Sequence, residues 1–230
     1  MKIRVKFAKK GYMKFIGHLD TMRYFQKAMR RADVDMMYSE GFNPHQKMSF
    51  AAPLGVGLTS SGEYMDIEVH STDCSEVMVK RLNEQMVEGM EVISYRQLPD
   101  DSKNAMSIVA AADYNIKFRE GLKPDIDLRD AFEKYVSQPE IIVLKKTKKS
   151  EKEIDIRPGI YEAKADDDSV FLKLASSSGD YLKPELVMDG FYKYIGMEMP
   201  KFVLEIERLE VYAGSVEEGF VTLEDLGREI

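Results

Sequence analysis

Residues 2–8 read KIRVKFA and residues 18–32 read HLDTMRYFQKAMRRA, and these two stretches decide the fold. In the first, apolar residues alternate with Lys and Arg, which predicts a strand with one face on a core. In the second, apolar residues recur at the 3.6-residue spacing of an amphipathic helix: Leu19, Met22, Phe25, Met29 and Ala32. A strand followed directly by such a helix indicates that the chain opens with a β-α unit.

The rest of the first hundred residues continues this unit. Alternation predicts strands at 34–39, 63–70 and 90–98, with a short strand at 48–51 and a helix at 75–87. The polar segment 99–104 reads as a linker. The order then recurs, with helices at 124–137 and 183–195 and with strands at 111–119, 140–146, 154–164, 170–175 and 202–212.

Each half therefore follows a β-α-β-β-α-β order, the second half with one extra strand or an extended hairpin. We predict an α+β protein with two tandem ferredoxin-like βαββαβ lobes, residues 1–99 and 105–213. Residues 214–230 read as an acidic tail with a short docking stretch around 220–226. A single continuous α+β domain is the alternative.

Composition excludes several classes of protein. With 44% hydrophobic residues and a net charge of -7 the chain is not disordered, and no stretch approaches the roughly 18 apolar residues of a membrane span. The N-terminus lacks the apolar segment of a signal peptide. A single cysteine, Cys74, fits a reducing cytoplasm and cannot supply a cysteine-ligated cluster. His18, His45 and His70 have no metal-ligand spacing, so we expect neither cofactor nor metal.

The net charge is unevenly distributed along the chain. Residues 1–50 hold 11 Lys and Arg against 4 Asp and Glu, a charge of +7. Residues 214–230 carry -4, which leaves -10 for residues 51–213. A basic segment of this kind keeps nucleic acid among the expected partners despite the acidic total.

The first candidate cluster lies at the start of the predicted helix. His18 and Asp20 stand at its N-terminus, where free backbone N–H groups attract anions. Beyond the first turn, cationic residues form a stripe opposite the apolar face: Arg23, Lys27, Arg30 and Arg31. The stripe predicts a binding surface for an anion. In the alternative interpretation Asp20 caps the helix and the cations are merely solvated.

The second candidate cluster is the loop at 39–47. It contains Glu40, Phe42, Asn43, His45 and Lys47. Phe42 is either a plug in the core, which the residue type favours, or a platform on which a base stacks. His45 is a candidate general acid or base, or a phosphate contact. Together with His18 and a carboxylate it would form an acid/base pair, but spacing alone does not show that these residues meet.

A third basic segment spans 145–157 and crosses a predicted hairpin. Its cations, offset by three acids, are Lys145, Lys146, Lys148, Lys149, Lys152 and Arg157. Such a ribbon either tracks a nucleic-acid backbone or keeps a sheet edge soluble.

With these residues in view, the run from 5 to 69 resembles the radical-SAM-linked proteins, a bacterial family of unknown function fused to or encoded beside a radical-SAM protein. The resemblance rests on Gly17-His18-Leu19-Asp20 and on residues 41–47, with Gln46 in place of a proline. In the second half, 145–158 and 182–185 also match, with Lys183 where an Arg is common. The resemblance implies a radical-SAM partner encoded nearby and no established activity for this chain.

We therefore expect a cytoplasmic auxiliary module, not an enzyme on its own, that binds RNA (tRNA or rRNA) and acts with a radical-SAM partner. The alternatives are a metal-independent endoribonuclease with His18 and His45 as acid and base, and a domain that binds a protein or a small anion. The fold order is similar to that of the endonucleases that process CRISPR repeats, which supports the ribonuclease alternative by analogy alone.

Overall fold

The computed structural model describes residues 1–146 and 151–230, and the chain divides into two units. Unit 1 comprises Met1–Ala110 together with Glu210–Ile230, and unit 2 comprises Ala111–Leu209. The boundary therefore follows Ala110, a few residues after the expected linker. The chain returns to unit 1 at its end, so the C-terminal residues belong to the first unit and do not form a separate tail.

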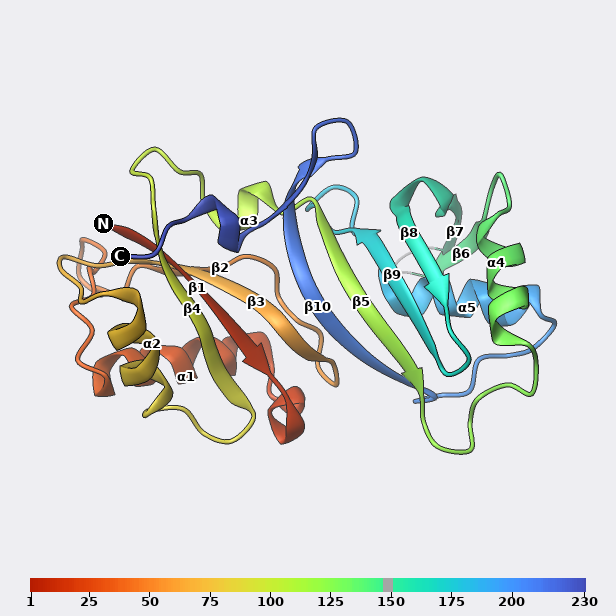
Figure 1. Cartoon of the computed structure of the whole chain (residues 1–230), viewed down its shortest axis with the longest axis horizontal. Helices are drawn as coiled ribbons and strands as arrows, with labels where there is room; N and C mark the ends of the chain where they lie inside the picture. Colours follow the sequence, from red (N-terminus) through yellow and green to blue (C-terminus); the bar gives the residue numbers. More distant parts are fainter. Residues whose placement is uncertain (147–150) are drawn as a thin grey trace. The chain divides into compact units, whose positions relative to one another are not determined.

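Unit 1 follows the predicted β-α-β-β-α-β order. Its elements are β1 (Lys2–Lys9), η1 (Gly11–Phe15), α1 (His18–Arg31), β2 (Met48–Phe50), β3 (Thr59–Glu68), α2 (Ser75–Asn83), β4 (Met90–Leu98) and α3 (Ala105–Ile108). The sheet order is β4-β1-β3 with β2 on the outer side of β3, and these pairs are all antiparallel. This is the strand order of a ferredoxin-like unit, and it confirms the predicted class (Figure 1).

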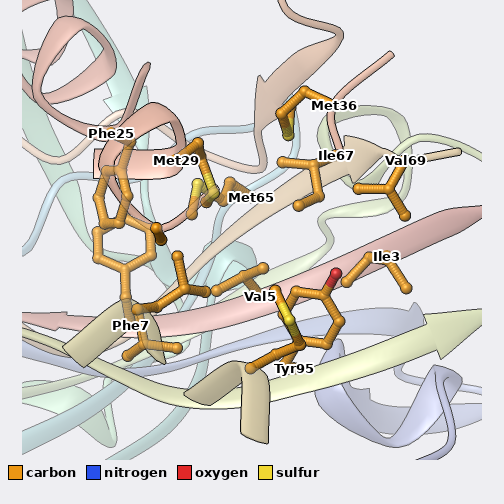
Figure 2. Packing of buried hydrophobic residues seen from close by; sticks show 14 of the residues in the cluster. Ile3, Val5, Phe7, Phe25, Met29, Met36, Met65, Ile67, Val69 and Tyr95 are labelled. Atoms are coloured by element: carbon orange, nitrogen blue, oxygen red, sulfur yellow. The ribbon is translucent and has the colours of Figure 1, made fainter. Parts of the chain in front are cut away.

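The core of unit 1 lies between one face of this sheet and both helices. The face of β1 that carries Ile3, Val5 and Phe7 packs on Phe25 and Met29 of α1 (Figure 2). The rings of Phe7 and Phe25 meet edge to face with centroids 4.6 Å apart. These apolar residues are the ones whose alternation predicts β1 and whose helical spacing predicts α1, so the pattern in the sequence matches the observed burial.

The predicted strand at 34–39 is wrong. In this segment Met36 and Tyr38 form only isolated bridges, to Val69 and Gln46. The backbone bonds alternate between two neighbours, since Met37 N–H donates to Glu68 and Met37 C=O accepts from Lys47. Because the two bridges are isolated and go to different partners, the segment forms no ladder, and β2 takes the second-strand position instead.

Unit 2 repeats the order with an insertion. Its elements are β5 (Ala111–Phe118), α4 (Leu128–Val136), β6 (Ile142–Lys146), β7 (Glu151–Asp155), η2 (Arg157–Gly159), β8 (Ile160–Ala165), β9 (Ser169–Ala175), α5 (Pro184–Tyr194) and the first half of β10 (Leu204–Ser215). The strand order is β10-β5-β9-β8, again ferredoxin-like, while β6 and β7 form a separate hairpin. This hairpin is the expected extra element.

The last residues of the chain cross unit 1. They form β11 (Gly219–Thr222), which pairs with the end of β10, and η3 (Glu224–Leu226). Between them Leu223 is fully buried, and Arg228 exchanges backbone hydrogen bonds with Gln97 of β4. The docking expected around 220–226 is thus extensive. Within the described ranges, none of the helices has the length and apolar character that crossing a membrane requires.

Candidate functional site

The two faces of α1 differ in composition, as its sequence predicts. The inward face buries Thr21, Phe25, Ala28 and Met29. The outward face exposes the four cations that we call the α1 basic face: Arg23, Lys27, Arg30 and Arg31. The position of these cations at the surface follows from the burial of the apolar stripe, because the helix cannot bury one face without exposing the other.

The guanidinium groups of this face retain most of their donors. Arg23 lies 3.4 Å from the Asp20 carboxylate, and both side chains are about two-thirds exposed, so the pair is weak. Arg30 donates one bond to the backbone oxygen of Gln26, and Arg31 one to that of Gln85. Each guanidinium has five N–H donors, which leaves donors to spare for a ligand.

The start of α1 differs from the alternative interpretation. The N-cap is Gly17, and no side chain caps the helix. Asp20 instead lies within the first turn, where a negative charge interacts favourably with the helix dipole. The ring of His18 packs edge to face on the core ring of Phe50, with centroids 5.3 Å apart. His18 therefore anchors the beginning of the helix.

The loop at 39–47 projects its side chains to solvent. Glu40, Phe42, Asn43 and His45 are exposed, and Phe42 is fully so, which contradicts the expectation that it plugs the core. Gly41, directly before Phe42, has a φ of 109°, a conformation that glycine adopts readily. Of the two interpretations, the exposed stacking platform is the one that this position allows.

A cleft of about 360 Å³ lies beside this loop. His45 lines it and is held by Ser39, whose Oγ lies 2.8 Å from Nδ1. Lys47 also lines it, but its Nζ donates to Glu68 at 2.9 Å. His18 is not among the described residues that line this cleft. His45 and Lys47 thus line one cleft, whereas His18 packs on Phe50 and is not part of that lining.

The hairpin ribbon is described only in part. Lys145 and Lys152 are register partners across β6 and β7. Arg157 donates from its guanidinium to the carbonyl of Ile160 at 3.0 Å. Lys148 and Lys149 lie outside the described residues.

A buried charged network on the sheet face away from the helices was not expected. Arg4 forms a bidentate pair with Asp66 at 2.8 and 3.0 Å and donates to the carbonyl of Leu223. Next to it, Lys6 donates to Glu210 at 2.7 Å and to Glu224 at 2.9 Å. The cations that alternate with apolar residues in β1 were the available signal, but their partners come from distant parts of the chain.

This network shifts the protonation of its members. Burial alone would lower the pKa of Lys6, but its hydrogen bonds to Glu210 and Glu224 raise the pKa above its usual value. Burial would raise the pKa of Glu224, yet hydrogen bonds from Lys6 and Ser94 lower it. Burial, reinforced by the charge of Glu210, strongly raises the pKa of the Tyr64 hydroxyl. At neutral pH these directions keep Lys6 and Glu224 charged and the Tyr64 hydroxyl neutral.

The network also changes the electrostatic interpretation of the first fifty residues. Counted by folded unit, unit 1 has 16 Lys and Arg against 20 Asp and Glu, a net charge of -4, and unit 2 has 17 against 20, or -3. Arg4, Lys6 and Lys47 are paired with acids and do not act as free cations. The α1 basic face holds four of the eleven cations of residues 1–50, and all four are exposed.

Comparison with known proteins gives one finding. Residues 2–184 match a family described as an uncharacterized protein conserved in bacteria (DUF2344). No curated protein matches the chain. Among the described residues, no group of three His, Cys, Asp or Glu side chains is arranged to hold a metal ion. Since the match covers well over half of the sequence, the chain belongs to this family of conserved bacterial proteins, DUF2344.

Proposed function

We propose that this protein is an auxiliary RNA-binding module that contacts RNA with the α1 basic face and acts with a radical-SAM partner. The observation that carries the proposal is the exposure of four cations on one side of a single well-packed helix. Cations fixed in this way attract phosphates without the cost of ordering a flexible segment.

The spacing of the cations suits a nucleic-acid strand. From Arg23 to Arg31 the helix rises about 12 Å at 1.5 Å per residue. At 3.4 Å per phosphate, as in one strand of a duplex, this length covers about three to four phosphates. The α1 basic face supplies four charges over that length, which Asp20 and Asp33 flank.

Phe42 adds a second type of contact. A fully exposed aromatic ring on the same unit offers a face on which a base can stack. Stacking tolerates any base, which suits a module that holds RNA and leaves the chemistry to another protein. Phosphate contacts and one stacked base together favour single-stranded RNA over a duplex.

The radical-SAM partner rests on the resemblance in residues 5–69. Radical-SAM chemistry needs an iron–sulfur cluster with several thiolate ligands, and this chain has one cysteine. The cluster would therefore belong to the partner, with this chain presenting the RNA.

Fluorescence anisotropy with a labelled 12-nucleotide single-stranded RNA at low salt tests the proposal. We expect wild-type protein to bind and the variant Lys27→Gln/Arg30→Gln to lose at least tenfold in affinity. The matched control, Lys134→Gln/Lys164→Gln, removes two exposed charges from unit 2 and should bind as wild type does. Absence of binding by wild type, or equal losses in both double variants, refutes the proposal.

A further inference from the structure

A second cleft, of about 410 Å³, lies wholly within unit 2. Its apolar lining residues include Ile156, Pro158, Ala175 and Leu182. Its sides include Tyr161 and Tyr181, so we call it the tyrosine cleft. An apolar concave surface with two aromatic rings and a few polar groups has the usual composition of a small-molecule site.

Tyr161 reaches this cleft from an irregular position in β8. The register of β8 on β9 pairs Ile160 with Leu174 and Glu162 with Lys173, which leaves Tyr161 as the extra residue of a bulge. A bulge redirects the side chain that it carries. Tyr161 keeps 37% of its surface exposed, enough to offer a face to a ligand.

Tyr181 approaches from the turn that follows β9. Its backbone bridges to Ser176, and the next residue, Leu182, donates its N–H to the carbonyl of Ala175. A Cβ at Gly159 would lie 3.1 Å from a Leu182 methyl carbon, so glycine permits this turn to pack closely. Tyr181 is 39% exposed, and the bonds around it hold its backbone in place.

Two carboxylates and one ammonium complete the lining. Asp155 is fixed because one of its oxygens accepts from the backbone N–H groups of Ile141 and Arg157, both at 2.9 Å. Asp180 lies on the turn beside Tyr181, and Lys145 is exposed at the end of β6. With two acceptors against one cation, the polar lining favours a ligand that donates hydrogen bonds, such as an amino group.

We propose that the tyrosine cleft binds one nucleobase with an exocyclic amino group, stacked on Tyr161 and Tyr181, with Asp155 and Asp180 accepting from the amino group. Adenine, guanine and cytosine fit this description, and uracil does not. The base comes either from a free nucleoside or from RNA, and only the second source rests on the function proposed above.

The fluorescence of 2-aminopurine, an amino-bearing base that is quenched on stacking, tests this inference with the full chain. The protein contains no Trp, so the probe can be excited apart from the protein. Titrations use 2-aminopurine riboside in one arm and a short RNA containing a single 2-aminopurine in the other. We expect saturable quenching, and competition by adenosine but not by uridine.

Variants connect the quenching to the cleft. Tyr161→Ala and Tyr181→Ala should each weaken binding about tenfold, because one stacked ring is lost. Tyr181→Phe keeps the ring and should bind as wild type does, which separates stacking from a folding defect. Tyr194→Ala, which truncates an exposed tyrosine of α5 outside the cleft lining, is the matched control and should not change the quenching.

Quenching of the riboside supports a site for free nucleosides, and quenching of the RNA alone supports a site for a base within a strand. Absence of quenching in both arms, or quenching that persists in both Tyr→Ala variants, overturns the inference. The two proposals can be tested separately. The variant Lys27→Gln/Arg30→Gln should weaken RNA binding measured by anisotropy and leave the quenching of the riboside intact. RNA that binds without quenching, together with a riboside that is not quenched, refutes the tyrosine cleft alone and leaves the RNA-binding proposal standing.

Discussion

The buried pair between Arg4 and Asp66 gives the sharpest test of how unit 1 is held together. The Arg4 side chain is 2% exposed and that of Asp66 13%, and the two share a bidentate contact. Asp66 also accepts from the backbone N–H of Ala105, and Arg4 donates to the carbonyl of Leu223. The pair therefore ties β1 and β3 both to the segment after β4 and to the end of the chain.

Replacement of Arg4 by Met removes one partner and leaves the Asp66 carboxylate largely buried. Breaking a buried pair in this way costs about 3–5 kcal/mol, and we expect the lower end because Asp66 keeps its bond from Ala105. With a urea dependence of about 2 kcal/mol per molar, a loss of about 3 kcal/mol lowers the unfolding midpoint by about 1.5 M. Arg4→Met/Asp66→Asn should cost less than Arg4→Met, because no uncompensated charge then remains buried.

Urea unfolding followed by circular dichroism measures these losses. Hydrogen–deuterium exchange of peptides from β1 and β5 assigns them to unit 1 or unit 2, since the two units need not unfold together. A loss below about 1 kcal/mol for Arg4→Met would refute the reasoning. So would a loss for Arg4→Met/Asp66→Asn that is greater than the loss for Arg4→Met.

Three further predictions concern unit 1. Because the pKa of Glu224 is lowered in the folded state, its contribution to stability is present above its usual pKa of 4.5 and is lost as the pH falls through the folded value. In Glu224→Gln the free energy of unfolding should therefore fall less between neutral and acidic pH than it does in the wild type. In Gly89→Ala, a Cβ would lie 2.5 Å from the carbonyl oxygen of Lys10, and the residue has a φ of 88°, so thermal unfolding should show a loss of about 3 kcal/mol in stability. The loss for Gly57→Ala, where a Cβ would meet no atom within 4 Å, should be about 1 kcal/mol. Phe42→Ala should leave stability within about 0.5 kcal/mol of wild type, because the ring is fully exposed, yet weaken RNA binding by about 1–3 kcal/mol in an anisotropy titration if a base stacks there.

Periodic stretches of the sequence predict the elements whose burial is decided locally. The alternation in β1 and the 3.6-residue spacing in α1 place Val5 and Phe25 in the core without knowledge of their partners. The tandem ferredoxin-like order follows from the repetition of such stretches. The strand expected at 34–39 fails because its alternation says nothing about which neighbours its backbone bonds will find.

Features that depend on distant residues were beyond prediction. The sequence indicates a docking stretch around 220–226 but not what it docks on, and the full burial of Leu223 becomes visible only when the segment lies across unit 1. Glu224, in the same segment, pairs with Lys6, which a count along the sequence treats as a free cation. Whether His18 and His45 meet also depends on the path of the loop between them, which no local spacing encodes.

The salt dependence of RNA binding tests the central claim, that the α1 basic face contacts phosphates, most directly. Neutralising three to four phosphates of a single strand predicts a slope of about -2 to -3 for the logarithm of the association constant against the logarithm of salt concentration. Lys27→Gln/Arg30→Gln should reduce the steepness of this slope by about 1.4. A slope near zero for wild-type protein, or an unchanged slope in that variant, would contradict the claim.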